Sequence, residues 1–217
     1  VDPLFRRKDP FLKGLVEKGR DFTEEEKQIL ITKQLAILKE IIPRYREVVS
    51  KGQIELSVSP FYHPILPLLC DTNSARVALP DIRLPHKRFS HPEDAEKQIR
   101  MGIEYFEKTF RYRPVGMWPS EGSVSEEVLR IAAKEGIQWL GTDEDILAIS
   151  LGKQLRDSSR NIIDPVALYK PYRFEDVSMI FRDHSLSDLI GFVYSKWDPK
   201  NAANDLINKL IHIRNSL

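Results

Sequence analysis

A short apolar segment at residues 115–118 runs directly into a turn that carries one carboxylate, Glu121. A helical pattern follows, and its start is indicated by Ser123 and Glu126, which have the three-residue spacing of a capping box. This order predicts that Glu121 lies at the mouth of a strand, close in sequence to Trp118. A single acid in this position is where a sugar-cleaving or a metal-assisted site would lie.

Two further apolar segments end in acids. Residues 137–142 lead into Asp143, and residues 177–182 lead into Asp183. Helices between such strands favour parallel pairing, so the three acids are expected at the C-terminal face of one sheet, where α/β enzymes build their sites. About four strands are clear, fewer than the roughly seven or eight of a complete barrel. We therefore expect an α/β fold with an incomplete parallel barrel.

Residues 53–59 alternate between polar and apolar side chains, which is the two-residue period of a strand. The polar face of this expected strand carries Glu55, Ser57 and Ser59. In a closed barrel these side chains would line the interior near the mouth, whereas in an open sheet they would face solvent. The pattern alone leaves both interpretations open.

Six further segments are expected to form helices or irregular stretches. Thr23 and Glu26 form a capping box ahead of a helix with one apolar face, in which Pro43 is expected to cause a kink or to start a second segment. A second amphipathic helix is expected from Ser90 to about residue 110, and a last one opens at Pro199 with an apolar stripe at Ala203, Leu206, Ile207, Leu210 and Ile211. Residues 1–22 read as a lead-in along the surface, residues 71–91 as a long loop, and residues 151–176 as irregular.

Composition excludes several classes of partner. The chain has 33 basic and 32 acidic residues, a net charge of +1 and no basic run, so neither nucleic acid nor an acidic membrane surface is expected as a partner. No apolar stretch approaches the ~20 residues of a membrane span, and the N-terminus lacks a signal-peptide pattern. The one cysteine, Cys70, lies in an apolar run and is expected to be a buried hydrophobe, which suits a reducing cytoplasm.

Four stretches of the chain together resemble glycoside hydrolase family 57, most closely its amylopullulanase-like members. They are residues 52–65, the Gly-Met-Trp-Pro-Ser-Glu-Gly run at 116–122, the Phe-Arg-Asp-His run at 181–184, and Leu186, Ser187 and Asp188 with Gly191 and Phe192. The match extends from about residue 23 to the end of the chain. It implies an incomplete (β/α)7 barrel and a retaining mechanism on α-glucans. The family's His-Gln-Pro motif and its fifth motif are absent, so we expect residues 1–217 to form part of a catalytic domain. The expected protein partner of this part is the remainder of the same catalytic domain.

The resemblance also implies two catalytic carboxylates. The glutamate of the Trp-Pro-Ser-Glu motif, here Glu121, is the nucleophile, and the aspartate after Phe-Arg, here Asp183, is the acid/base. Asp188, in the same motif, is a competing choice for the second carboxylate. A retaining glycosidase needs its two carboxyl groups about 5–5.5 Å apart. No cofactor is expected.

Five further residues are candidates for substrate binding: Glu55, His63, Trp118, His184 and Asp188. Trp118 could stack on a pyranose ring or lie in the core, and the two histidines could donate to sugar hydroxyls or simply pack in turns. Asp143 is expected to cap a helix or to lie in a loop. These alternatives remain open from the sequence.

Two other functions remain. A metal-dependent polysaccharide deacetylase would use Asp183, His184 and one of His63, His86 or His91 as ligands, since histidine and aspartate make good divalent-metal sites. The histidines are scattered and form no helical His-x-x-x-His pair, which argues against this reading. A truncated fragment that only binds glucan is the third class.

Overall fold

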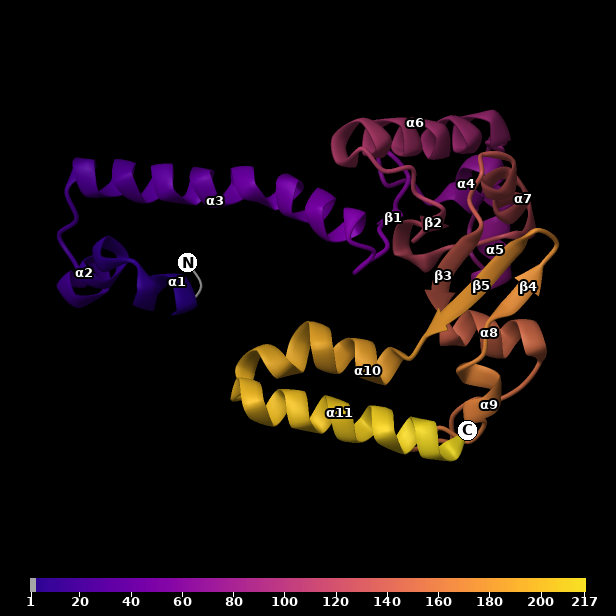
Figure 1. The fold of residues 1–217 in the computed structure, drawn as a ribbon. Coiled ribbons are helices and arrows are strands. Elements are labelled where there is room, and N and C mark those ends of the chain that lie inside the picture. The colour runs from indigo at the N-terminus through magenta and orange to yellow at the C-terminus, as the bar shows by residue number, and fades with distance from the viewer. Residues whose placement is uncertain (1–2) are drawn as a thin grey trace. The chain divides into compact units, whose positions relative to one another are not determined.

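The structure, a computed structural model, describes residues 3–217 and divides into two compact units. Residues 3–55 and 109–112 form the N-terminal unit, and residues 56–108 and 113–217 form the sheet unit. Figure 1 shows the ribbon with the elements labelled. Each unit is described by itself.

The N-terminal unit contains three helices: α1 (Pro3–Lys8), α2 (Pro10–Lys18) and α3 (Glu24–Ser50). Of the lead-in expected at residues 1–22, residues 1–2 lie outside the described part and residues 3–22 are largely helical. Asp9 caps α2 by accepting hydrogen bonds from the amides of Phe11 and Leu12. Thr23 and Glu26 form the predicted capping box of α3. The helix continues through Pro43 as one element, so no second segment begins there.

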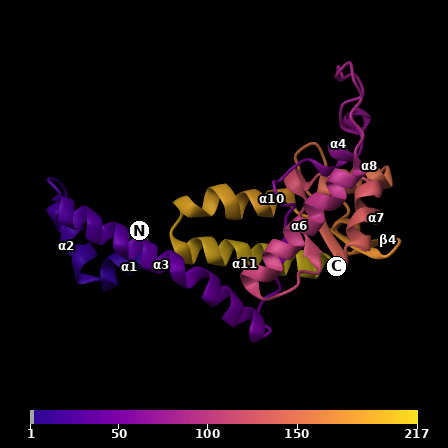
Figure 2. The same cartoon turned by 90° about the horizontal axis from the view of Figure 1, so that it is seen from above.

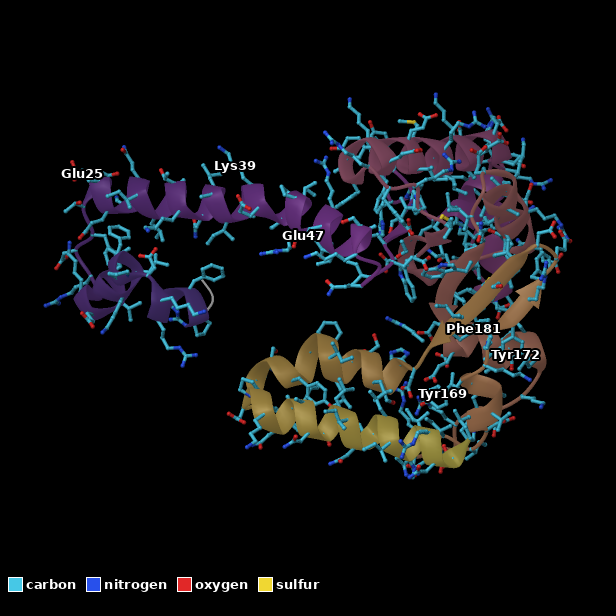
Figure 3. All side chains as sticks on the ribbon, in the orientation of Figure 1. Glu25, Lys39, Glu47, Tyr169, Tyr172 and Phe181 are labelled. Carbon is cyan, nitrogen blue, oxygen red and sulfur yellow. The ribbon has the colours of Figure 1, made fainter. Side chains whose placement is uncertain are left out.

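The long helix α3 does not bury its apolar face within the described residues. Ile31, Leu35 and Leu38 are each more than half exposed. Its charged side chains form pairs along the surface, and Figure 3 labels Glu25, Lys39 and Glu47 on it. Glu47, for example, is paired with Arg44 and Lys51, both at 2.5 Å.

The sheet unit is built on five strands in the order β1-β2-β3-β5-β4. These are β1 (Ser57–Val58), β2 (Gly116–Met117), β3 (Trp139–Asp143), β4 (Tyr172–Phe174) and β5 (Val177–Arg182). Strands β1, β2, β3 and β5 are parallel, and β4 pairs with β5 in the antiparallel direction. The predicted α/β class with a parallel sheet is confirmed. The strand expected at residues 53–59 is reduced to two residues.

Three helices enclose the main core: α4 (Leu66–Cys70), α6 (Pro92–Phe110) and α7 (Glu126–Lys134). They bury apolar side chains against β2, β3 and β5, and Figure 1 shows the ribbons of these helices next to the sheet. Cys70 is 3% exposed, as predicted, and burial raises the pKa of its thiol to about 11. Two predicted helix starts are wrong: Ser125 rather than Ser123 caps α7, and Ser90 donates to the carbonyl of Cys70 instead of capping α6.

A second, smaller core lies beside α8 (Glu144–Leu151) and α9 (Pro165–Leu168). It contains Leu147, Leu155, Ala167 and Leu168, and Tyr172 meets Phe181 edge-on with ring centroids 5.7 Å apart. Figure 3 labels both rings beside the strands that carry them. The stretch 151–176 is thus not simply irregular, since it holds α9 and β4. Residues 71–91 likewise contain two short helical turns, η1 (Thr72–Ser74) and α5 (Ala75–Ala78).

The last segment is a helical hairpin. It begins with α10 (His184–Asp188), continues through a π turn (Leu189–Val193) and a 3-10 turn (Tyr194–Lys196), and returns as α11 (Pro199–Ser216). Both views place α10 and α11 side by side (Figures 1 and 2). The predicted helix from Pro199 is confirmed, but Ile207, Leu210 and Ile211 of its apolar stripe are exposed. Across residues 3–217, no helix combines the length and the apolar character needed to cross a bilayer.

Candidate active site

The parallel strands end at one edge of the sheet, and the candidate acids follow those ends. Glu121 comes four residues after β2, Asp143 is the last residue of β3, and Asp183 follows β5 directly. Because β2, β3 and β5 are consecutive neighbours in the parallel sheet, these acids belong to the same C-terminal edge. We call the residues on this edge the strand-end cluster: His63, Trp118, Glu121, Asp143, Arg182, Asp183, His184 and Asp188.

Glu121 is presented to solvent by a strained turn. It lies in the 3-10 turn η2 (Ser120–Gly122). Its backbone has φ 54° and ψ 20°, in the left-handed region that non-glycine residues rarely adopt. Its side chain is 74% exposed, and its Oε1 lies 3.4 Å from Nε2 of His63. His63 itself has φ 57°. Such conformations cost free energy and concentrate at functional sites.

Trp118 lies between the turn and the sheet. Its backbone amide donates to the carbonyl of Val58, and its ring covers Gly141 so closely that a Cβ there would come within 2.7 Å of the ring. The guanidinium carbon of Arg182 is 5.8 Å from the ring centroid, within the range of a cation–π contact. The indole is half-buried, so part of it stays accessible for stacking.

Asp183 is held by three donors and is only 6% exposed in its side chain. Its Oδ1 accepts from Nη2 of Arg156 at 2.8 Å and from the amide of Leu186 at 2.9 Å, so it caps α10. Its Oδ2 accepts from the hydroxyl of Tyr169. Burial and this hydrogen bond raise the pKa of the Tyr169 phenol well above its usual range.

Arg156 joins Asp183 to a second buried acid, Glu144. The guanidinium donates to both carboxylate oxygens of Glu144, at 2.7 and 3.0 Å, and the Glu144 side chain is only 3% exposed. Sequence reasoning missed Arg156, Tyr169 and Glu144. Neither Arg156 nor Tyr169 belongs to a strand or a motif, and Glu144 gave only the signal of being one of three successive acids.

Three other members of the strand-end cluster form a charged group around Asp143. Its Oδ2 accepts from Nε of Arg182 at 2.7 Å and lies 3.5 Å from Nδ1 of His184, whose Nε2 lies 3.6 Å from Asp188. Burial alone would raise the pKa of the Asp143 carboxyl, but Arg182, the amide of Asp145 and the charge of His184 together hold it below its usual value. Asp143 also caps α8, as expected.

The ligand set suggested for a deacetylase is not assembled. Among the described residues, the group with metal-ligand atoms within 4.8 Å of one another consists of Asp143, Asp145 and His184. Asp183 is not among them, nor are His63, His86 and His91. Arg182 already supplies a positive charge to Asp143.

Glu55 belongs to the N-terminal unit, where it is exposed and precedes β1. Ser59, from the same expected strand, lies in the sheet unit and donates through its hydroxyl to the carbonyl of Trp118 at 3.0 Å. The expected alternation thus places one of its polar residues against the Trp118 turn.

The chain resembles several solved structures. It is 16% identical to an α-amylase from Thermotoga maritima, with a TM-score of 0.53. The aligned region covers 86% of this chain and 30% of the amylase. It is 16% identical to a family 57 branching enzyme from Thermococcus kodakaraensis, with a TM-score of 0.54 (85% and 34% covered). It is 18% identical to a family 57 branching enzyme from Pyrococcus horikoshii, with a TM-score of 0.50. The aligned region covers 86% of this chain and 35% of that enzyme.

These likenesses establish a shared fold, in which this chain spans about a third of each neighbour's length. No curated protein matches the sequence. The incomplete barrel expected from the sequence agrees with this partial coverage. The model of glycosyl hydrolase family 57 matches residues 9–216, nearly the whole chain. The chain therefore belongs to glycosyl hydrolase family 57.

Proposed function

We propose that this chain forms part of the active site of a retaining glycoside hydrolase that acts on α-glucans. Membership of family 57 supports a glycosidase-type enzyme. The neighbours named α-amylase and branching enzyme support an α-glucan as substrate. The rest of the barrel, outside the part described, would complete the substrate site.

The observation that carries the proposal is the geometry of Glu121. A nucleophile must reach the anomeric carbon, and Glu121 is an exposed carboxylate in the turn that follows the parallel strand β2, where its backbone is left-handed. His63, 3.4 Å away, can orient the carboxylate by a hydrogen bond. Attack by Glu121 would give a glycosyl-enzyme, which water or a sugar acceptor then releases.

Asp183 is proposed as the acid/base, because it follows β5 directly at the same edge of the sheet as Glu121. Glu144, Arg156 and Asp183 together carry a formal charge of −1 when all three are ionised. Arg156 binds both acids and holds the Asp183 carboxyl beside the end of β5.

Trp118, His63, His184 and Asp188 are proposed to bind the sugar. The half-buried ring of Trp118 offers a stacking surface, and His184 and Asp188 lie 3.6 Å from each other at the start of the helical hairpin. Asp188 is the competing acid/base, because it lies in the same sequence motif and its side chain is 50% exposed.

Two kinds of variant test these roles in the full-length protein. Glu121→Gln should lower kcat on soluble starch by at least about 10⁴-fold, as expected on losing a nucleophile, while Glu126→Gln, at an exposed ion pair, should leave it unchanged. Normal starch hydrolysis by Glu121→Gln would overturn the assignment.

An activated substrate then separates the two aspartates. α-Maltosyl fluoride needs no proton donor for its leaving group, so an acid/base variant should still form the glycosyl-enzyme from it while losing starch hydrolysis. We expect this pattern for Asp183→Asn and not for Asp188→Asn. The reverse pattern would give the acid/base role to Asp188.

A further inference from the structure

The two oxygens of the Asp183 carboxylate have different surroundings. Oδ1 accepts two hydrogen bonds, from Nη2 of Arg156 at 2.8 Å and from the amide of Leu186 at 2.9 Å. Oδ2 accepts one, from the hydroxyl of Tyr169. Each carboxylate oxygen has two lone pairs, so both are engaged on Oδ1 and one is left on Oδ2. A proton on Asp183 is therefore held at Oδ2.

The two donors at Oδ1 are fixed in place. The guanidinium of Arg156 also donates to both oxygens of Glu144, at 2.7 and 3.0 Å, so it cannot turn away without breaking a buried pair. The amide of Leu186 belongs to the first turn of α10, which Asp183 caps. Neither group can accept a hydrogen bond. A proton placed on Oδ1 would thus have to displace one of them.

The hydroxyl of Tyr169 can follow both protonation states of Asp183. It donates to Oδ2 when the carboxyl is ionised, and after rotation about its C–O bond it can accept from Oδ2 when the carboxyl is protonated. Burial and the hydrogen bond to Asp183 raise the pKa of the phenol well above its usual range. The hydroxyl therefore keeps its own proton while Asp183 changes state.

The position of the Tyr169 ring is set by α9. Asp164 caps the start of this helix by accepting from the amide of Ala167, and the amide of Tyr169 closes its end on the carbonyl of Pro165 at 2.9 Å. The Tyr169 side chain packs against the small core that contains Leu168. Figure 3 labels the residue. The ring is therefore held on two sides, and its hydroxyl reaches Asp183 from a fixed place.

We propose that Tyr169 is a positioning residue, which fixes Oδ2 as the atom of Asp183 that gives and takes the proton during glycoside cleavage. The proposal rests on the proposed function, in which Asp183 is the acid/base. No motif of the sequence indicated Tyr169.

The proton returns to Oδ2 over one catalytic cycle. In the first step it passes from Oδ2 to the leaving oxygen as the glycosidic C–O bond breaks, and the Tyr169 hydroxyl turns to donate to the carboxylate that remains. In the second step Oδ2 takes one proton from the water that releases the sugar from Glu121. The hydroxyl then turns back to accept.

Tyr169→Phe tests this role in the full-length protein, because it removes the hydroxyl and keeps the ring. It should lower kcat on soluble starch at least about tenfold, a part of the roughly 10²- to 10⁴-fold that general acid–base catalysis supplies. KM should stay unchanged. With α-maltosyl fluoride, whose leaving group needs no proton, the first release of fluoride should be as fast as in the original chain. A hydroxyl with a purely structural role would affect both substrates alike.

Tyr172→Phe is the matched control. Tyr172 packs against the same small core, and its hydroxyl donates to the carbonyl of Ala167 at 2.8 Å, a hydrogen bond that does not involve Asp183. This variant should hydrolyse starch as the original chain does. Thermal unfolding followed by circular dichroism verifies the fold of both variants.

Three results would overturn the proposal: an unchanged kcat on starch in Tyr169→Phe, equal losses in Tyr169→Phe and Tyr172→Phe, or equal slowing of starch hydrolysis and of fluoride release by Tyr169→Phe. Failure of the proposed function looks different, because Asp183→Asn would then retain starch hydrolysis. Loss of hydrolysis in Asp183→Asn with full activity in Tyr169→Phe would refute the role of Tyr169 alone.

Discussion

At the scale of single residues, the site depends on charges that satisfy one another away from water. Arg156 holds two acids, Glu144 and Asp183, whose side chains are 3% and 6% exposed. The position of Asp183 after an apolar segment predicted a strand end but no partner for it, because Arg156 lies in a stretch without regular periodicity. Long-range contacts of this kind cannot be inferred from spacing along one chain.

Replacing Arg156 by alanine should therefore be strongly destabilising. It leaves Glu144 and Asp183 as buried carboxylates without a cation, and the cost of breaking a buried pair is about 3–5 kcal/mol. Urea unfolding followed by circular dichroism measures this loss in the free energy of unfolding. Arg173→Ala is the control, because its pair with Asp176 is exposed and should contribute about 0–1 kcal/mol. Equal effects of the two variants would show that the Arg156 group is not a buried network.

The lowered pKa of Asp143 predicts a pH-dependent contribution to stability. In the unfolded chain this carboxyl has the ordinary aspartate pKa of about 3.9, and folding lowers that pKa, so the folded state favours the ionised form. The stability is therefore present above the unfolded pKa and is lost as the pH falls through the folded pKa.

Asp143→Asn isolates that charge, since asparagine still caps α8. The variant should be less stable than the original at pH 7, and the difference should shrink as the pH falls below about 4, near the unfolded pKa. The difference is measured from the free energies of unfolding of the original chain and of Asp143→Asn between pH 7 and pH 3. A gap that stays constant over this range would contradict the assignment of the effect to ionised Asp143.

At the scale of elements, the order of strand, acid and helix was enough to predict a parallel sheet and the strand ends that bear Glu121, Asp143 and Asp183. Helix starts were less predictable. The cap of α7 is Ser125, two residues after the expected Ser123, because the hydroxyl of Ser125 accepts a hydrogen bond from the amide of Val128. The antiparallel strand β4 was missed, since its three residues turn back at Glu175 in a left-handed conformation. Short hairpins give too few residues for a period to be seen.

The packing of Trp118 on Gly141 of β3 leads to a prediction for that glycine. Gly141 faces the indole, and an added Cβ would lie 2.7 Å from one ring carbon and 2.9 Å from another. Gly141→Ala should therefore displace the ring and destabilise the sheet unit by about 1–3 kcal/mol, the usual cost of overpacking.

Near-ultraviolet circular dichroism and urea unfolding report these two effects of Gly141→Ala. Gly191→Ala serves as the control, because nothing lies within 4 Å of a Cβ at that position. An unchanged tryptophan signal in Gly141→Ala would show that Trp118 does not pack on β3.

At the scale of the whole molecule, the chain is a family 57 sheet unit with a helical hairpin whose apolar faces are left outside. The apolar periodicity predicted the α/β fold class, and the order of the motifs predicted the family, because both are properties of the sequence itself. The exposure of Ile207 and Leu210 on α11 was not predictable, since an apolar stripe ordinarily marks the buried face of a helix. Orientation about a helix axis is decided by tertiary contacts.

The most direct test of the account asks whether Glu121 forms the covalent intermediate. A 5-fluoro maltosyl fluoride, which forms the glycosyl-enzyme faster than it is released, is incubated with the full-length protein and the digested peptides are weighed by mass spectrometry. We expect a maltosyl adduct on the peptide that contains Glu121 and no adduct in Glu121→Gln. An adduct on another carboxylate, such as Asp183 or Asp188, or turnover of starch without any adduct, would contradict it.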